Sequence, residues 1–312
     1  MNHSPRNSSA TPSGAVSAHA HRTALVLAGA GAAGNAWQLG LIAGLGDVGI
    51  DLTAVDLVIG TSAGSTVAAQ ITSGTRPSDL YAAIVAEDPP PAARRTGPGQ
   101  HRAPRVSGPA YMEWSDAIIA SSRDASDMRR RFAAAALELD TSDGVDGARW
   151  RSIVEARLPT SEWPRQRVFI TAVDAHTAEP VVFDRDSGIE LVDAVAASTS
   201  PMTPYPIGEH RYLNGAYRRG SNADLAAGCA RVLVLEPFSG RSRQPLEWGI
   251  DLATQVDELR AGGSTVETVF PDAGSGDVFN ANALDPSTRP PAARGGYAQG
   301  RALAGRLAEF AS

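Results

Sequence analysis

Two short apolar segments each lead directly into a glycine-containing turn and then into a helical pattern. The first is TALVLAG at 23–29, with a helical pattern over 35–46, and the second is VDLVIG at 55–60, with another over 62–74. Apolar runs of this length, bounded by glycine, are typical of buried strands. Strands that alternate with helices usually pair in parallel and are covered on both faces. The sequence therefore predicts an α/β fold with a largely parallel central sheet.

The rest of the chain continues this alternation. Further strands are predicted at 167–174, 179–184 and 231–238, with a strand edge at 211–217, and helices at 111–139, 150–158, 189–198, 222–229, 246–260 and 294–310. The segment 88–109 is rich in Pro, Gly and Arg and has no periodicity. We predict that it is a mobile loop over or beside the functional cleft, because long loops in compact domains are usually functional.

Composition excludes several classes of function. The net charge is −6, so the chain has no basic footprint for nucleic acid. No run of about 18 apolar residues could cross a bilayer, and the single cysteine, Cys229, fits a reducing compartment. The polar start lacks the apolar segment of a signal peptide. We therefore expect a cytoplasmic protein with a disordered tail over 1–21 and one domain over 22–312.

The segment GTSAG at 60–64 places a serine between two glycines, after a strand and before a helix. This is the G-x-S-x-G pattern of the nucleophile elbow, in which a tight turn exposes the serine hydroxyl. The helix that follows favours negative charge near its start. The pattern predicts Ser62 as a nucleophile, with Gly60 and Gly64 making room for the turn.

A second glycine pattern lies at the end of the first strand, where Gly29, Gly31 and Gly34 form G-x-G-x-x-G. This pattern is also the dinucleotide fingerprint, and Asp51 or Asp56 follows at the spacing expected of a ribose partner. A nucleotide-binding enzyme is therefore one reading. The other is that the backbone N–H groups of this loop form an oxyanion hole for Ser62.

No histidine is well placed to activate Ser62. A triad of the α/β-hydrolase kind needs a histidine after the last strand, and none follows His210. We expect surface positions for His101, His176 and His210. Among the acids, we expect a helix-start role for Asp224 and turn roles for Asp174, Asp184 and Asp186.

These features together resemble the patatin-like phospholipase family, over nearly the whole chain from residue 23 to about 310. The resemblance rests on the loop AGAGAAGNAWQLG at 28–40, the elbow GTSAG at 60–64 and the block YLNGAYRRGSNADLAAG at 212–228. It implies a three-layer α/β/α sandwich and a Ser–Asp dyad without histidine. It also implies hydrolysis of lipid or phospholipid esters in lipid degradation, transient contact with a membrane surface, and no metal or organic cofactor.

The resemblance assigns roles residue by residue. Ser62 matches the nucleophile, and the segment Gly29, Ala30, Gly31, Ala32 and Gly34 matches the oxyanion loop. The family's block carries Asp-Gly-Gly or Asp-Gly-Ala, and its aspartate takes the serine proton. This chain has Asn214, followed by Gly215 and Ala216. An amide can hydrogen-bond a hydroxyl but is not basic near neutral pH.

Asn214 in place of the family's aspartate leaves two interpretations of the function, in addition to that of a dinucleotide-binding enzyme. The first is a serine acyl hydrolase of reduced activity, because an oxyanion hole alone retains part of the catalysis. The second is a catalytically impaired member of the family that binds acyl lipid or a protein partner.

Overall fold

One mixed β-sheet forms the centre of the protein. The structure is a computed structural model that describes residues 22–87, 108–140 and 145–310. In the described part, eight strands form the sheet in the order β5-β6-β3-β2-β1-β7-β8, with β4 also paired to β3. Their bounds are β1 Thr23–Leu27, β2 Leu57–Gly60, β3 Arg167–Asp174, β4 Pro180–Phe183, β5 Tyr205–Ile207, β6 His210–Asn214, β7 Arg231–Leu235 and β8 Thr265–Val269.

Five neighbouring strands of this sheet, from β3 to β8, run parallel, whereas β4, β5 and β6 are antiparallel to their partners. The prediction of a largely parallel sheet is thus confirmed. The registers pair Leu27 of β1 with Gly60 of β2 and with Leu235 of β7. The segments that follow β1, β2 and β7 consequently leave the sheet side by side at its carboxyl edge, where α/β folds place their sites.

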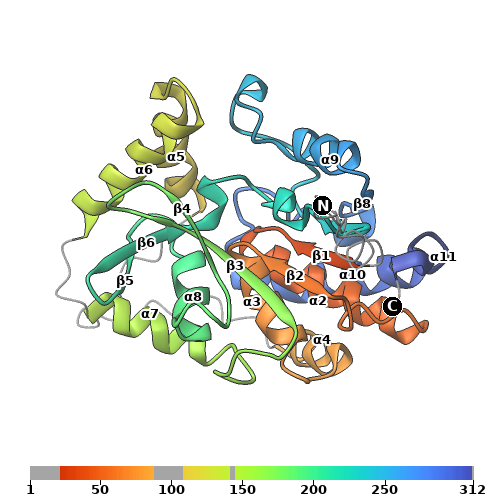
Figure 1. Ribbon diagram of the computed structural model, residues 1–312. Coiled ribbons are helices and arrows are strands. Elements are labelled where there is room, and N and C mark those ends of the chain that lie inside the picture. The colour runs from red at the N-terminus through yellow and green to blue at the C-terminus, as the bar shows by residue number, and fades with distance from the viewer. Residues whose placement is uncertain (1–21, 88–107, 141–144, 311–312) are drawn as a thin grey trace, which may run out of the picture.

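Helices cover both faces of the sheet (Figure 1). Leu25 and Leu27 of β1 pack into one core with the helices α2, α3, α8 and α10, while Ala24 and Val26 pack into another with α9. This alternation follows from the period of two along a strand. The bounds are α2 Gly31–Asp47, α3 Ala63–Ile71, α4 Pro77–Val85, α5 Gly108–Ser121, α6 Ala125–Leu139, α7 Val145–Glu155, α8 Leu191–Ser198, α9 Leu252–Ala261, α10 Arg289–Ala302 and α11 Ala304–Leu307.

Helices α2 and α10 approach so closely that glycine is required at their contact. A Cβ on Gly296 would lie 2.3 Å from the carbonyl oxygen of Trp37, and one on Gly44 would lie 2.2 Å from that of Tyr297. The Trp37 indole N–H also donates to Gln299 Oε1 at 2.9 Å. This contact anchors the helix that begins at the glycine-rich loop.

Most predicted elements are present, with several differences. Helix α4 was not predicted, and the helix predicted over 246–260 begins only at Leu252, after the 3-10 turn η3 (Leu246–Trp248). The helix predicted over 111–139 is two helices, because Asp124 accepts from the N–H of Asp127 and starts α6. The segment 222–229 forms only a 3-10 turn, η2 (Ala223–Ala226), after Asn222 in the left-handed region at φ 57°. Strands β5 and β8 were not predicted, and β8 follows the strand expected to be last. The predicted tail at 1–21 and positions 88–107 of the predicted loop lie outside the described residues.

Candidate active site

Ser62 lies on a strained turn between β2 and α3. Its backbone has φ 53° and ψ −124°, a combination that costs about 1–3 kcal/mol and persists only where the surroundings impose it. Close contacts at Gly60 and Gly64 impose this backbone conformation. A Cβ on Gly60 would lie 2.6 Å from Ser65 Cα, and one on Gly64 would lie 2.0 Å from the Leu27 carbonyl oxygen. The turn therefore has the geometry of a nucleophile elbow.

Hydrogen bonds on both sides hold the Ser62 backbone. Its N–H donates to Ser198 Oγ of α8 at 2.9 Å, and its carbonyl oxygen accepts from the Ser65 hydroxyl at 2.6 Å. The Ser62 side chain is half-buried and lies against Gly29, where a Cβ would come within 2.7 Å of Ser62 Cβ. The hydroxyl is thus held next to the glycine-rich loop that follows β1.

The loop after β1 offers backbone donors beside Ser62. In the described part of the chain, no acceptor is bound to the N–H groups of Gly29 and Ala30, nor to those of Gly31 and Ala32 at the start of α2. Gly34 differs from the expectation, because its N–H donates to the Ala30 carbonyl oxygen at 2.9 Å. Its lack of a side chain serves packing, since a Cβ would lie 2.4 Å from Ala30 Cβ.

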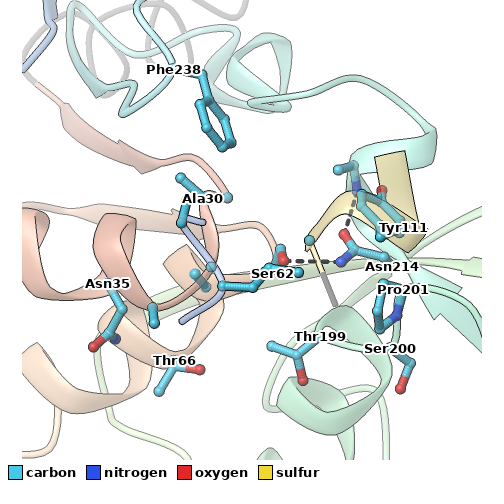
Figure 2. Close-up of a pocket in the computed structure, with 18 of the residues that line it drawn as sticks. Ala30, Asn35, Ser62, Thr66, Tyr111, Thr199, Ser200, Pro201, Asn214 and Phe238 are labelled. Carbon is cyan, nitrogen blue, oxygen red and sulfur yellow. Dashed lines mark hydrogen bonds between the residues drawn. The ribbon is translucent and has the colours of Figure 1, made fainter. Parts of the chain in front are cut away.

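Asn214, the last residue of β6, contacts the Ser62 hydroxyl directly (Figure 2). Its Nδ2 donates to Ser62 Oγ at 2.9 Å, and its Oδ1 accepts from the N–H of Ala216 at 3.0 Å. The Ala216 N–H can only donate, so it fixes which end of the amide faces Ser62. Ser62 Oγ is therefore the acceptor of this bond, and the amide nitrogen that faces it offers no lone pair for the serine proton.

A buried polar network lies behind both turns. The Asn222 amide donates to the hydroxyl of Thr61 at 3.0 Å and to the carbonyl oxygen of Gly215 at 3.1 Å. Thr171 of β3 bonds Thr61 through their hydroxyls at 3.0 Å, and a Cβ on Gly215 would lie 2.1 Å from Thr171 Oγ1. This network fixes the elbow and the Asn214 turn relative to each other.

The other acids considered from the sequence lie elsewhere. Asp224 is bound by the Arg218 guanidinium through two hydrogen bonds. Asp174 accepts from two backbone N–H groups of its own turn, and Asp184 accepts from the N–H of Asp186. His210 pairs with Asp174 at 3.2 Å, at the opposite end of β6 from Asn214. Among the described residues, no histidine lines the cavity next to Ser62.

Glu236 is a site residue that the sequence did not reveal. It follows β7 directly and lines the same cavity as Ser62, with only 7% of its surface exposed. Burial raises the pKa of Glu236 to about 7, against a smaller lowering by the N–H of Phe238. The only sequence signal was a single acid in the apolar run VLVLEPF.

The cavity that contains these residues has a volume of about 1700 Å³. Figure 2 shows Asn35 and Thr66 on one side of Ser62, and Asn214 and Tyr111 on the other. Apolar side chains of α5, α6 and the segments after β7 also line the cavity, among them Met112, Ile119, Phe132 and Phe238. The site thus combines an exposed hydroxyl, nearby amide donors and room for a large apolar ligand.

Neither aspartate considered as a ribose partner of a dinucleotide lies where a dinucleotide would bind. Asp56 accepts from the N–H of Thr23, the first residue of β1, at 2.8 Å. It therefore lies at the amino edge of the sheet, whereas dinucleotides bind at the carboxyl edge. Asp51 is exposed and bonds Thr53. Within the described ranges there is also no group of three or more His, Cys, Asp or Glu that could hold a metal ion.

Comparison with known protein families agrees with the predicted resemblance. The sequence model of the patatin-like phospholipase family matches residues 25–227. This range is more than half of the chain and includes the glycine-rich loop, the elbow and Asn214. The chain belongs to the patatin-like phospholipase family. Its α/β sandwich is the fold expected of a patatin-like phospholipase.

Among curated proteins, no significant match was found. Among solved structures, the crystal structure of the type III effector protein ExoU matches with a TM-score of 0.35 and 17% sequence identity. The match covers 90% of this patatin-like chain and 53% of the ExoU chain, so this chain spans about half the length of that protein. No helix in the described part of the protein is long and apolar enough to span a membrane.

Proposed function

We propose that this protein is a serine acyl hydrolase that acts on lipid or other acyl esters through Ser62. The observation that carries the proposal is the placement of the Ser62 hydroxyl. It stands on a strained elbow, within 2.9 Å of Asn214 and against the glycine-rich loop that offers four backbone donors. Membership of the patatin-like phospholipase family supports an ester of a lipid as the substrate.

In the proposed reaction, Ser62 Oγ attacks the acyl carbonyl carbon and the carbonyl oxygen becomes negatively charged. The N–H groups of Gly29 to Ala32 bind this oxygen, and the amino end of the 17-residue helix α2 adds to the favourable field. The carbon–oxygen bond of the ester then breaks, and the departing alcohol takes up a proton. Water subsequently cleaves the acyl-serine and restores Ser62.

The proton is the difficult part of this reaction. Asn214 donates to Ser62 Oγ and cannot accept its proton, so water in the cavity must take it. Enzymes of this kind that lack a catalytic residue retain about 10³–10⁴-fold acceleration over water from oxyanion binding and substrate binding. We therefore expect measurable but slow turnover.

Steady-state hydrolysis of p-nitrophenyl butyrate tests the proposal. The Ser62→Ala variant should lose all turnover above background while keeping the circular dichroism spectrum of the wild type. Ser73→Ala is the matched control, because Ser73 follows α3 and its hydroxyl, within the described part of the chain, bonds only the backbone at Gln70 and Thr75. Unchanged hydrolysis in Ser62→Ala would show that the nucleophile lies elsewhere.

The Asn214 amide favours a second candidate, a family member that binds acyl lipid without cleaving it. In that case the wild type would bind a fatty acid in the cavity but would release no alcohol from any ester. Calorimetric titration with oleate, combined with the hydrolysis assay, separates the two candidates.

A further inference from the structure

One lobe of the cavity extends from Ser62 along helix α3. Thr66 and Gln70 follow Ser62 at intervals of four residues, so they lie on the same face of the helix, and both are buried residues that line the cavity. At 1.5 Å per residue, Gln70 is about 12 Å further along the helix than Ser62. This lobe is on the side of Ser62 away from Asn214 (Figure 2).

Three side chains and one backbone carbonyl group meet at the far end of this lobe. Asn35 of α2 donates to Gln70 Oε1 at 3.3 Å, and Arg289, which starts α10, donates to Asn35 Oδ1 at 2.7 Å. Gln70 in turn donates to the carbonyl oxygen of Arg157, just beyond α7, at 2.9 Å. All four residues line the cavity. The hydrogen bonds hold two arginines at the end of the lobe.

The positive charge at this end is only partly neutralised. Arg289 donates to Glu87 at 2.9 Å, whereas Arg157 forms no ion pair with any described residue. Arg157 is an exposed residue, yet desolvation of its guanidinium, and secondly the charge of Arg289, lower its pKa. Arg157 lies 5.4 Å from the ring centre of Trp150, which fixes its direction. A guanidinium without a carboxylate partner among the described residues, in the same cavity as a second guanidinium, forms a site that an anion would stabilise.

Apolar side chains line the cavity together with the polar Thr66, Gln70 and Asn35. They include Leu80 and Ile84 of α4 and Ile153 of α7. Four acids line the cavity. Glu87 is paired with Arg289, and Asp146 lies at the other end of α7 from Arg157, while Glu236 directly follows β7 and Asp251 directly precedes α9. An aliphatic chain could therefore extend from Ser62 to Arg157 along these apolar side chains.

We propose that Arg157 and Arg289, at the Gln70 end of this lobe, bind an anionic group of the substrate. The helical rise of about 12 Å from Ser62 to Gln70 sets the scale of its separation from the carbonyl that Ser62 attacks. The inference rests on the proposed hydrolase function and names its substrate class, an acyl ester with a second, distal negative charge. An extended chain advances about 1.2 Å per bond, so about ten bonds separate the two groups. Carboxylate and phosphate both fit the guanidinium pair.

Paired ester substrates test this selectivity. The p-nitrophenyl half-ester of decanedioic acid carries the distal carboxylate on the acyl side, and p-nitrophenyl decanoate is its uncharged counterpart. A second pair, 10-butyryloxydecanoic acid and decyl butyrate, places the carboxylate on the alcohol side. In at least one of the two pairs, we expect kcat/KM for the charged ester to exceed kcat/KM for the uncharged ester by at least tenfold. A ratio near one in both pairs would overturn the inference.

Variants then assign the selectivity to the arginines. Arg157→Gln should lower the charged-to-uncharged ratio of kcat/KM at least tenfold. Arg289→Gln should act in the same direction. The control is Arg76→Gln at the N-cap of α4. This arginine is exposed, its only ion pair among the described residues is with Asp79, and its replacement should not affect the ratio. A ratio retained in both cavity variants would contradict the assignment.

A binding measurement separates this inference from the proposed function. In the Ser62→Ala background, monomethyl decanedioate should bind at least tenfold more tightly than methyl decanoate in calorimetric titration. The added substitution Arg157→Gln should remove that preference. Binding without preference would overturn the anionic subsite, whether or not the wild type hydrolyses esters. A preference without any turnover would support the subsite and contradict the hydrolase.

Discussion

Replacing Asn214 by Asp should increase ester hydrolysis, because it reverses the hydrogen bond at the nucleophile. In the wild type, Nδ2 donates to Ser62 Oγ at 2.9 Å, while Oδ1 accepts from the Ala216 N–H at 3.0 Å. Aspartate has nearly the same shape, so one oxygen can keep the Ala216 bond and the other replaces Nδ2. The Ser62 hydroxyl then becomes the donor, and a carboxylate stands at the right distance to take its proton.

The size of the gain follows from the role of a general base. Positioned proton transfer contributes typically about 10²–10⁴-fold, and the geometry that it needs already exists around Asn214. We expect kcat/KM to rise at least tenfold, which corresponds to about 1.4 kcal/mol of transition-state stabilisation. Activity of the variant should also rise with pH as the new carboxyl group ionises.

The assay is hydrolysis of p-nitrophenyl butyrate by wild type, Asn214→Asp and Asn282→Asp. The last variant adds the same charge at an exposed position outside the cavity and should not increase activity. Asn214 precedes glycine, a sequence prone to deamidation, so peptide mapping must show that the wild-type sample still contains asparagine. If the Asp variant is no faster than verified wild type, another group activates Ser62 and the reasoning is refuted.

Two further predictions concern stability, measured by urea unfolding. Burial raises the pKa of Glu236 from 4.5 to about 7, so between these values the folded protein binds one proton more than the unfolded chain. Stability should therefore fall by about 3 kcal/mol as pH rises through this window. The Glu236→Gln variant should avoid this loss, so its free energy of unfolding should equal that of the wild type at pH 4.5 and exceed it at about pH 8. A difference in unfolding free energy that does not change with pH would contradict the assigned burial. Gly296→Ala should destabilise by about 1–3 kcal/mol or more, because its Cβ would lie 2.3 Å from the Trp37 carbonyl oxygen. Gly46→Ala on α2, with nothing within 4 Å, should instead stabilise by about 0.5–1 kcal/mol, and equal losses in both variants would disprove the close helix contact.

The sequence predicted those parts of the site that depend on local geometry. Gly60 and Gly64 flank Ser62 because the turn has no space for a Cβ at either position, and such steric requirements leave a readable pattern. The strand–helix alternation was equally visible, since it reflects burial on both faces of the sheet. The family block also led to Asn214 as the residue opposite Ser62, although its hydrogen-bond direction required the structure.

Features that depend on distant contacts could not be predicted in this way. Glu236 resembled the polar end of a strand, and only the packing around it shows that its carboxyl group is buried in the cavity. Arg157 and Arg289 belong to segments far apart in the chain and meet only through Gln70 and Asn35. The helix expected over 222–229 failed because Asn222 adopts a left-handed conformation to reach Thr61 and Gly215.

Covalent labelling with a fluorophosphonate tests the central claim, that Ser62 is a nucleophile beside an oxyanion hole, most directly. The reagent places a phosphonyl oxygen where the oxyanion would form, so labelling requires both the hydroxyl and its donors. Mass spectrometry of the intact wild-type protein and of its peptides should show one adduct, on the peptide that contains Ser62. The adduct should be absent from Ser62→Ala and should form faster in Asn214→Asp. A folded wild-type protein that stays unlabelled, or an adduct that persists in Ser62→Ala, would contradict the account.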